Sequence, residues 1–152
     1  MAAASLRNAQ ADWFARRVAR LSDDRLARVM RGPQRGFWLG QVFRAMPHQL
    51  DPDAAKGVEA VVDYEIGGRR DGGQDRWRVF IEAGRCRVAR SPHGSADVTL
   101  TLDAASFLRL ASGSASGPQL FLLGRLEVAG DLTLAMRLPS LFRVPEPPRR
   151  LT

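Results

Sequence analysis

Residues 121–138, FLLGRLEVAGDLTLAMRL, constrain the fold more than any other part of the chain. Their pattern predicts the end of an apolar helix, a glycine, a short alternating strand, a Gly-Asp turn and a second apolar helix. No side chain in this segment has the character of a catalytic group. In a chain of 152 residues, such an apolar segment is either plain core or the wall of an apolar cavity.

The first fifty residues show helical spacing. Apolar side chains recur on one face over residues 4–21 and again over residues 34–46, which predicts two amphipathic helices. A third helix is expected between them, because Ser22 is a suitable N-cap and two aspartates follow it in the first turn. Pro47 is expected to end the helix over residues 34–46.

After these helices the spacing of the apolar residues changes, and apolar and polar side chains alternate along the chain. This pattern predicts strands over residues 58–66, 76–82, 86–88, 97–102 and 125–129. The remaining helices are expected to begin at Asp103, Pro118 and Asp131. The order predicts an α+β domain with a five-stranded, mostly antiparallel sheet, helices packed on one face of it, and the N-terminal amphipathic helices in addition.

Charge is concentrated at the two ends of the chain. The net charge is +7, of which residues 1–50 carry +6, residues 51–136 carry −2 and residues 137–152 carry +3. Nearly all basic residues are arginine, which genomic base composition or attraction to an anionic lipid or nucleic acid would explain. No apolar run approaches the length of a membrane span, no secretory signal is recognisable, and Cys86 is the only cysteine, so we expect a cytoplasmic protein.

The second half of the chain resembles the sterol-carrier (SCP-type) lipid-binding domain. A strand of the form D-x-T-L-T-L at residues 97–102 leads into a helix with Phe107, and a loop with Gly113 and Pro118 follows. The pattern F-x-x-G-K/R-L-x-x-x-G-D/N-x-x-x-A-x-x-L is then met by Phe121, Gly124, Arg125, Leu126, Gly130, Asp131, Ala135 and Leu138. The resemblance covers roughly residues 45–142.

The resemblance implies a function without a reactive group. It implies an apolar tunnel between sheet and helices, closed by the C-terminal helix, that binds a sterol, a fatty acyl chain or a related lipid. The alternative is an accessory subunit or enzyme of lipid, isoprenoid or polyketide metabolism that presents an apolar substrate. No catalytic residue and no cofactor are expected. The candidate lining of the cavity is Val98, Leu100, Leu102, Phe107, Leu108, Leu120, Phe121, Leu126, Val128, Leu132, Met136 and Leu141.

The same twelve side chains are also suited to packing against one another as ordinary core.

Three departures from the family pattern stand out. Leu123 occupies a position where glutamine is frequent, the chain ends without a peroxisomal tripeptide, and the first forty-five residues have no counterpart in the minimal domain. We therefore divide the chain into a helical extension (1–46), a lipid-binding domain (47–142) and a proline-rich basic tail (143–152).

The basic N-terminal helix suggests a second role. We expect Arg7, Arg16, Arg17 and Arg20 to dock the protein on an anionic membrane while the apolar stripe packs on the domain. A homodimer contact through that stripe is the alternative.

Other functions lack support in the sequence. His48 and His93 have no second metal ligand at a standard spacing, so no metal site is expected. Cys86 lies within a strand pattern and is expected to be a small buried side chain. Nucleic-acid binding is not expected, because no binding motif is present and the three tryptophans show no clustering as a stacking platform.

Overall fold

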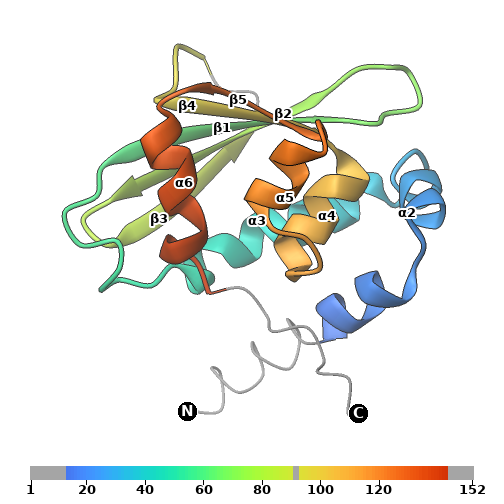
Figure 1. Cartoon of the computed structure of the whole chain (residues 1–152), viewed down its shortest axis with the longest axis horizontal. Coiled ribbons are helices and arrows are strands. Elements are labelled where there is room, and N and C mark those ends of the chain that lie inside the picture. Colours follow the sequence, from blue (N-terminus) through green and yellow to red (C-terminus); the bar gives the residue numbers. More distant parts are fainter. Residues whose placement is uncertain (1–12, 91–92, 144–152) are drawn as a thin grey trace.

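A computed structural model describes residues 13–90 and 93–143 of the chain. Five strands form one sheet in the order β3-β2-β1-β4-β5 (Figure 1). Their bounds are β1 Ala60–Gly67, β2 Asp75–Glu82, β3 Arg85–Arg90, β4 Val98–Asp103 and β5 Leu126–Gly130. All neighbouring pairs are antiparallel except β1 and β4, which run parallel. The predicted fold class is confirmed.

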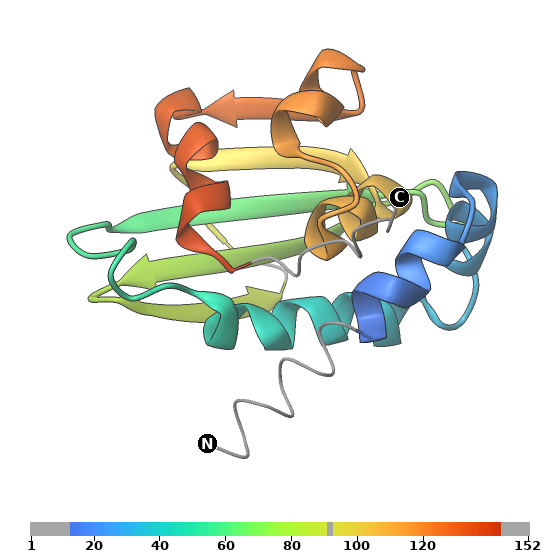
Figure 2. The ribbon, with the colours of Figure 1, turned by 60° about the horizontal axis from the view of Figure 1, so that its bottom comes forward.

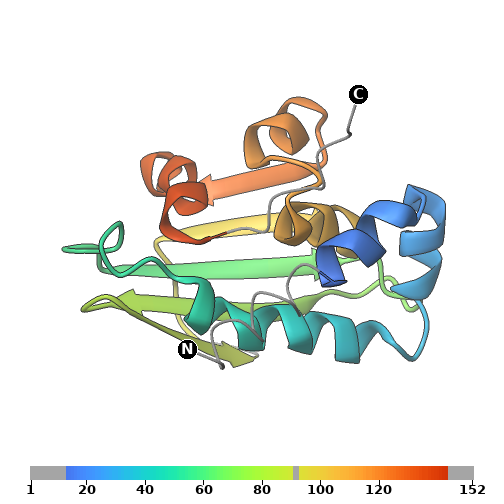
Figure 3. The ribbon, with the colours of Figure 1, turned by 90° about the horizontal axis from the view of Figure 1, so that it is seen from below.

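The helices pack on one face of this sheet (Figures 2 and 3). Residues 13–20 are helical, and the other helices are α2 Asp23–Val29, α3 Arg35–Gln49, α4 Ala104–Ser112, α5 Gly117–Leu122 and α6 Leu132–Leu141. Apolar residues of the strands alternate toward this helical layer, as in Val62, Tyr64 and Ile66 of β1, each of which is buried.

Local chemistry sets the element boundaries. Ser22, Asp103 and Asp131 each accept a hydrogen bond from a backbone N–H in the first turn of the helix that follows, as predicted. Ala83 and Gly84 both have a positive φ, which a two-residue turn between β2 and β3 requires. These contacts fix where each element begins, and therefore which side chains face the sheet.

Pro47 does not end α3, contrary to the sequence prediction. The helix continues to Gln49, and the N–H of Leu50 bonds to the carbonyl of Met46 at 3.2 Å. Proline in the last turn removes a single intrahelical hydrogen bond, and the helix geometry is otherwise kept. α3 thus runs across the predicted boundary at residue 46.

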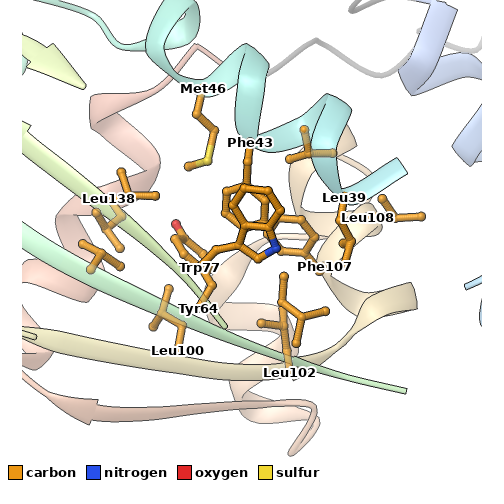
Figure 4. Close-up of a cluster of buried hydrophobic side chains, with 14 of the residues drawn as sticks. Leu39, Phe43, Met46, Tyr64, Trp77, Leu100, Leu102, Phe107, Leu108 and Leu138 are labelled. Atoms are coloured by element: carbon orange, nitrogen blue, oxygen red, sulfur yellow. The ribbon is translucent and has the colours of Figure 1, made fainter. Parts of the chain in front are cut away.

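An aromatic cluster fills the space between α3 and the sheet. The ring of Phe43 stacks on Trp77 with centroids 4.4 Å apart and on Phe107 with centroids 5.1 Å apart. Tyr64 meets Phe43 edge-on at 5.6 Å (Figure 4). Met46 of α3 and Leu138 of α6 extend this packing toward the other end of the layer. The chain's own side chains therefore occupy much of the interior.

Candidate functional site

Most of the predicted lining residues are buried. Eight of the twelve have side chains in the hydrophobic core, with exposures of 7% or less: Val98, Leu100, Leu102, Phe107, Leu108, Leu120, Leu126 and Leu141. They come from β4, α4, α5, β5 and α6, so the fold brings together residues far apart in the sequence. Their burial agrees with both interpretations of the segment, as core and as inner wall of a ligand site.

Three predicted lining residues lie at the surface instead. Phe121 is 51% exposed, Leu132 is 53% exposed and Met136 is 74% exposed. This placement corrects the expectation that all twelve line an enclosed interior. The physical reason is helix geometry, because the face of α6 that carries Leu134 and Leu138 packs inward, and residues 132 and 136 share another stripe.

These three side chains belong to a larger exposed group. Leu122 and Leu123 at the end of α5 are 84% and 64% exposed. α5 and α6 contact each other, and both contact β5. We call the five side chains the α5–α6 apolar surface: Phe121, Leu122, Leu123, Leu132 and Met136. Half-buried Val128 of β5 lies on the helical side of the sheet, opposite Leu100 in the neighbouring strand.

Sequence reasoning did not include Leu122 and Leu123 among the candidates. The sequence does contain a signal for these two residues, which is the run of four apolar residues at 120–123. Consecutive residues of a helix face different directions, so only some of the four can face the core and the others must be exposed. In α5 only Leu120 is buried. A run of four large apolar residues in so short a helix therefore indicates exposed apolar surface.

A hollow of a different character lies where α2 meets the start of α4. This cleft has a volume of about 340 Å³ and both acidic and basic side chains in its wall, among them Asp23, Asp24, Arg31, Arg69 and Arg125. Arg125 also forms an ion pair with Asp23 at 3.5 Å. Apolar side chains of Ala27, Met30, Ala104 and Ala105 also line this cleft, so its wall is mixed in character.

Burial affects the pKa of two side chains in the sheet, Cys86 and Tyr64. Burial raises the pKa of the Cys86 thiol to about 11, so at neutral pH it is protonated and a poor nucleophile. Burial also raises the pKa of Tyr64. Within residues 13–90 and 93–143, no group of three histidine, cysteine or acidic side chains is arranged to hold a metal ion.

Of the predicted membrane-docking arginines, the structure places three. Arg16, Arg17 and Arg20 are exposed on the helix of residues 13–20, while Arg7 lies outside the described residues. On the same helix Ala15 and Val18 are buried, so part of the apolar stripe packs on the domain as expected. Among the described residues, no helix is long and apolar enough to cross a membrane.

Comparison with known proteins decides the family. Residues 39–143 match the SCP-2 sterol transfer family over most of the chain. The chain belongs to this family. The match begins at Leu39, within α3, and the division of the chain at residues 46 and 142 stays a prediction.

Curated relatives share this domain at low identity. The chain is 23% identical over 105 residues to hydroxysteroid dehydrogenase-like protein 2 of Xenopus laevis, covering 68% of this chain and 24% of that protein. It is 25% identical over 114 residues to sterol carrier protein 2 of Rattus norvegicus, covering 73% of this chain and 21% of that protein. The SCP-2 domain thus spans about a quarter of the length of these relatives.

A solved structure shows the same fold. The sterol carrier protein domain 2 of Helicoverpa armigera superposes with a TM-score of 0.58 at 20% identity, covering 72% of this chain and 88% of that domain. The five-stranded sheet with helices on one face is therefore shared, and the family is one of lipid-binding domains.

Proposed function

We propose that this SCP-2 domain binds an apolar ligand reversibly and transfers it, without catalysing a reaction on it. The ligand is a sterol, a fatty acyl chain or a related lipid. The observation that carries the proposal is the α5–α6 apolar surface, where five large apolar side chains stand exposed beside a buried apolar layer. Large apolar side chains that stay exposed on neighbouring elements indicate a candidate binding site.

The expected affinity suits transfer. Covering about 400 Å² of apolar area on the ligand contributes at most about 10 kcal/mol. Association and ordering cost on the order of 4–15 kcal/mol. Weak, reversible binding follows, because the two contributions are of similar size and the net gain is at most about 6 kcal/mol.

The same elements also contribute to the interior. Leu120 of α5 and Leu126 of β5 are buried, and Val128 of β5 is half-buried. A single buried side chain attaches α5 to the core, whereas α6 buries three leucines. The backbone also ties α6 to the domain near both ends, because the N–H of Asp131 donates to the carbonyl of Asp97 and the N–H of Asp51 donates to the carbonyl of Leu141. We therefore assign α5 as the wall that moves when an acyl chain passes inward, and α6 as the fixed wall.

A pair of polar substitutions tests the site. Leu132 and Met136 are exposed, so the variant L132S/M136S is expected to fold normally. Each lost side-chain contact weakens binding of cis-parinaric acid by roughly tenfold, measured by fluorescence titration. The matched control is F37S, which removes an equally exposed apolar side chain from α3 and should leave the affinity unchanged. Equal affinities for the wild type and L132S/M136S would refute the proposed site.

Native mass spectrometry followed by organic extraction tests the ligand class. The purified wild-type protein should carry a co-purified lipid, and L132S/M136S should carry less of it. A protein that neither retains lipid nor binds cis-parinaric acid would contradict the proposed function as a whole.

The free thiol of Cys86 is consistent with the predicted cytoplasmic location.

A second function is suggested by the small share of the relatives' length that the match covers. The SCP-2 domain corresponds to about a quarter of a protein named as hydroxysteroid dehydrogenase-like. We therefore propose as the alternative that the domain holds an apolar substrate for an enzyme of lipid, isoprenoid or polyketide metabolism. Capture of such an enzyme by the wild type, with loss of capture by L132S/M136S and retained cis-parinaric acid binding, would favour this alternative.

A further inference from the structure

A buried hydrogen-bond donor without a partner lies in the apolar layer between α3 and the sheet. Trp77 of β2 is 8% exposed. Of the buried side-chain nitrogen and oxygen atoms in the part of the chain that the structure describes, its indole Nε1 alone lacks a hydrogen-bond partner. An unpaired buried donor is unfavourable, and native proteins rarely keep one. Such a donor therefore marks a place where a bound molecule can supply the missing acceptor.

Aromatic rings surround this donor. Phe43 of α3 stacks on the Trp77 ring, and the same Phe43 ring contacts Phe107 of α4 and Tyr64 of β1. Tyr64 is the partner of Trp77 in the register of β1 and β2, so the two side chains lie next to each other on the helical face of the sheet. Figure 4 shows the indole nitrogen inside this cluster. Apolar ring surface thus extends up to the donor.

Water is a poor partner for the indole N–H in these surroundings. A buried water molecule needs two to four polar partners, and the rings of Phe43 and Phe107 supply none. The hydroxyl of Tyr64 is a second polar group in the cluster, and burial raises its pKa, so it is protonated at neutral pH. Both polar groups in the cluster are therefore uncharged and can bond to a single oxygen atom.

The oxygen that fits this place carries no charge. The Arg90 guanidinium lies over the Trp77 ring, 4.9 Å from its centroid, but its side chain is 62% exposed and pairs with Asp75 at 3.5 Å. This cation is held at the surface. A carboxylate that reached Nε1 would lose its hydration away from the cation, which is strongly unfavourable. A hydroxyl, ketone or ester oxygen meets no such penalty.

We propose that Trp77 Nε1 donates a hydrogen bond to an uncharged oxygen of the ligand, so that the domain selects neutral oxygenated lipids over carboxylates. This inference rests on the proposed function, because it places the polar end of the same ligand. Three strand spacings separate β2 from β5 in the sheet, which is about 14 Å. A long-chain ligand whose oxygen lies at Trp77 therefore extends toward the α5–α6 apolar surface with its apolar end.

A matched pair of ligands tests this hydrogen bond. Methyl pentadecyl ketone and heptadecane have equal chain lengths, and only the ketone carries an oxygen. Each is titrated against the full chain loaded with cis-parinaric acid. W77F removes the N–H but keeps an aromatic ring, and should weaken binding of the ketone roughly three- to tenfold relative to heptadecane. The volume lost in W77F affects both ligands alike, so the ratio of the two affinities isolates the hydrogen bond.

Two controls accompany this titration. W38F removes a tryptophan of α3 that is also 8% exposed, and should leave the ratio of the two affinities unchanged. W77F should keep the wild-type affinity for cis-parinaric acid at neutral pH, because the carboxylate of this probe stays in water. A loss of cis-parinaric acid binding as large as the loss of ketone binding would contradict the selection of an uncharged oxygen. Circular dichroism and urea unfolding show that each variant is folded.

Nuclear magnetic resonance of the indole N–H observes the donor itself. The Trp77 resonance is assigned by its absence in W77F, and should move downfield when the ketone binds but not when heptadecane binds. A resonance that lies upfield and does not respond to the ketone would refute the inference, because Nε1 would then donate to the face of an aromatic ring.

Other results would overturn the inference and leave the proposed function standing. An equal loss of both ligands in W77F would show that Trp77 acts by packing alone. A changed ratio in Y64F, with an unchanged ratio in W77F, would assign the contact to the hydroxyl of Tyr64. The proposed function itself fails if neither ligand displaces cis-parinaric acid from the wild type and no lipid co-purifies with it.

Discussion

Asp63 and Arg78 form a buried ion pair on the face of the sheet opposite the helices. Arg78 Nε donates to Asp63 Oδ1 at 2.7 Å, and its two terminal nitrogens donate to the carbonyls of His93 and Gly94. Asp63 is 1% exposed and Arg78 is 6% exposed. One guanidinium thus holds the backbone of His93 and Gly94 against this face.

Removing the guanidinium of Arg78 should lower the stability of the fold. Arg78→Met leaves a buried carboxylate and two carbonyls without their donor, and we expect it to lower the free energy of unfolding by about 3–5 kcal/mol. Urea denaturation measures this. The control is Arg76→Met, because Arg76 is more exposed and lies 3.7 Å from the same carboxylate, so its loss should cost under about 1 kcal/mol. Equal costs for the two variants would contradict the argument.

The thiol of Cys86 gives a pH-dependent prediction. Its pKa is raised by burial from 9.0 to about 11. Between these values the unfolded state loses its proton first, so this group's contribution to stability falls as the pH rises. Alkylation by iodoacetamide, followed by mass spectrometry, should be slow in the folded protein at pH 8 and accelerate toward pH 11. A folded protein that reacts at pH 8 as fast as one in urea would contradict the burial.

At the scale of elements, Arg109 of α4 attaches the N-terminal helices to the domain. Its Nη1 donates to the carbonyl of Val18 at 2.8 Å, its Nη2 donates to the carbonyl of Leu21, and its Nε donates to Asp23 at 3.0 Å. Its side chain is 15% exposed. One planar guanidinium therefore holds the end of the first described helix and the start of α2.

Arg109→Met should release these helices without unfolding the sheet. Two carbonyls lose their donor, at about 1–3 kcal/mol each, so local opening becomes more frequent. Trypsin cleavage after exposed Arg17 or Arg20 should accelerate roughly tenfold, as followed by mass spectrometry. Arg109→Lys keeps the charge but lacks the fork of donors, and should rescue only part of the protection. Unchanged cleavage in Arg109→Met would show that apolar packing alone holds the helices.

The sequence predicts these elements well where the signal is local. The caps at Ser22, Asp103 and Asp131 depend on residues within one helical turn, and the alternation in β1, β2 and β4 depends on neighbours two apart. The prediction that Pro47 ends α3 was wrong, because the free-energy cost of a proline in a helix depends on its distance from the end of the helix. The contact of Trp13 with Trp38 was not predictable, because it depends on how two helices separated in the sequence pack together.

The candidate site was predictable only in part for a related reason. Apolar periodicity identifies residues that avoid water in some state of the protein, but it does not say whether the chain or a partner covers them. Buried Leu138 and exposed Met136 lie on one apolar helix, and the sequence pattern alone does not separate them. Exposed apolar side chains are thus where the structure adds most to the functional argument.

At the scale of the whole molecule, the α5–α6 apolar surface predicts that ligand binding and ligand transfer depend on the same side chains. Transfer of a fluorescent fatty acid between vesicles should therefore slow in L132S/M136S, which should also weaken the binding of cis-parinaric acid in solution.

The control F37S decides whether the ligand site acts by itself. Phe37 lies on α3 and shares no element with Leu132 and Met136 of α6, so F37S should transfer the fatty acid like the wild type. A loss of solution affinity in F37S would show instead that the exposed side of α3 and the ligand site are coupled through α3, whose Phe43 lies at the centre of the core.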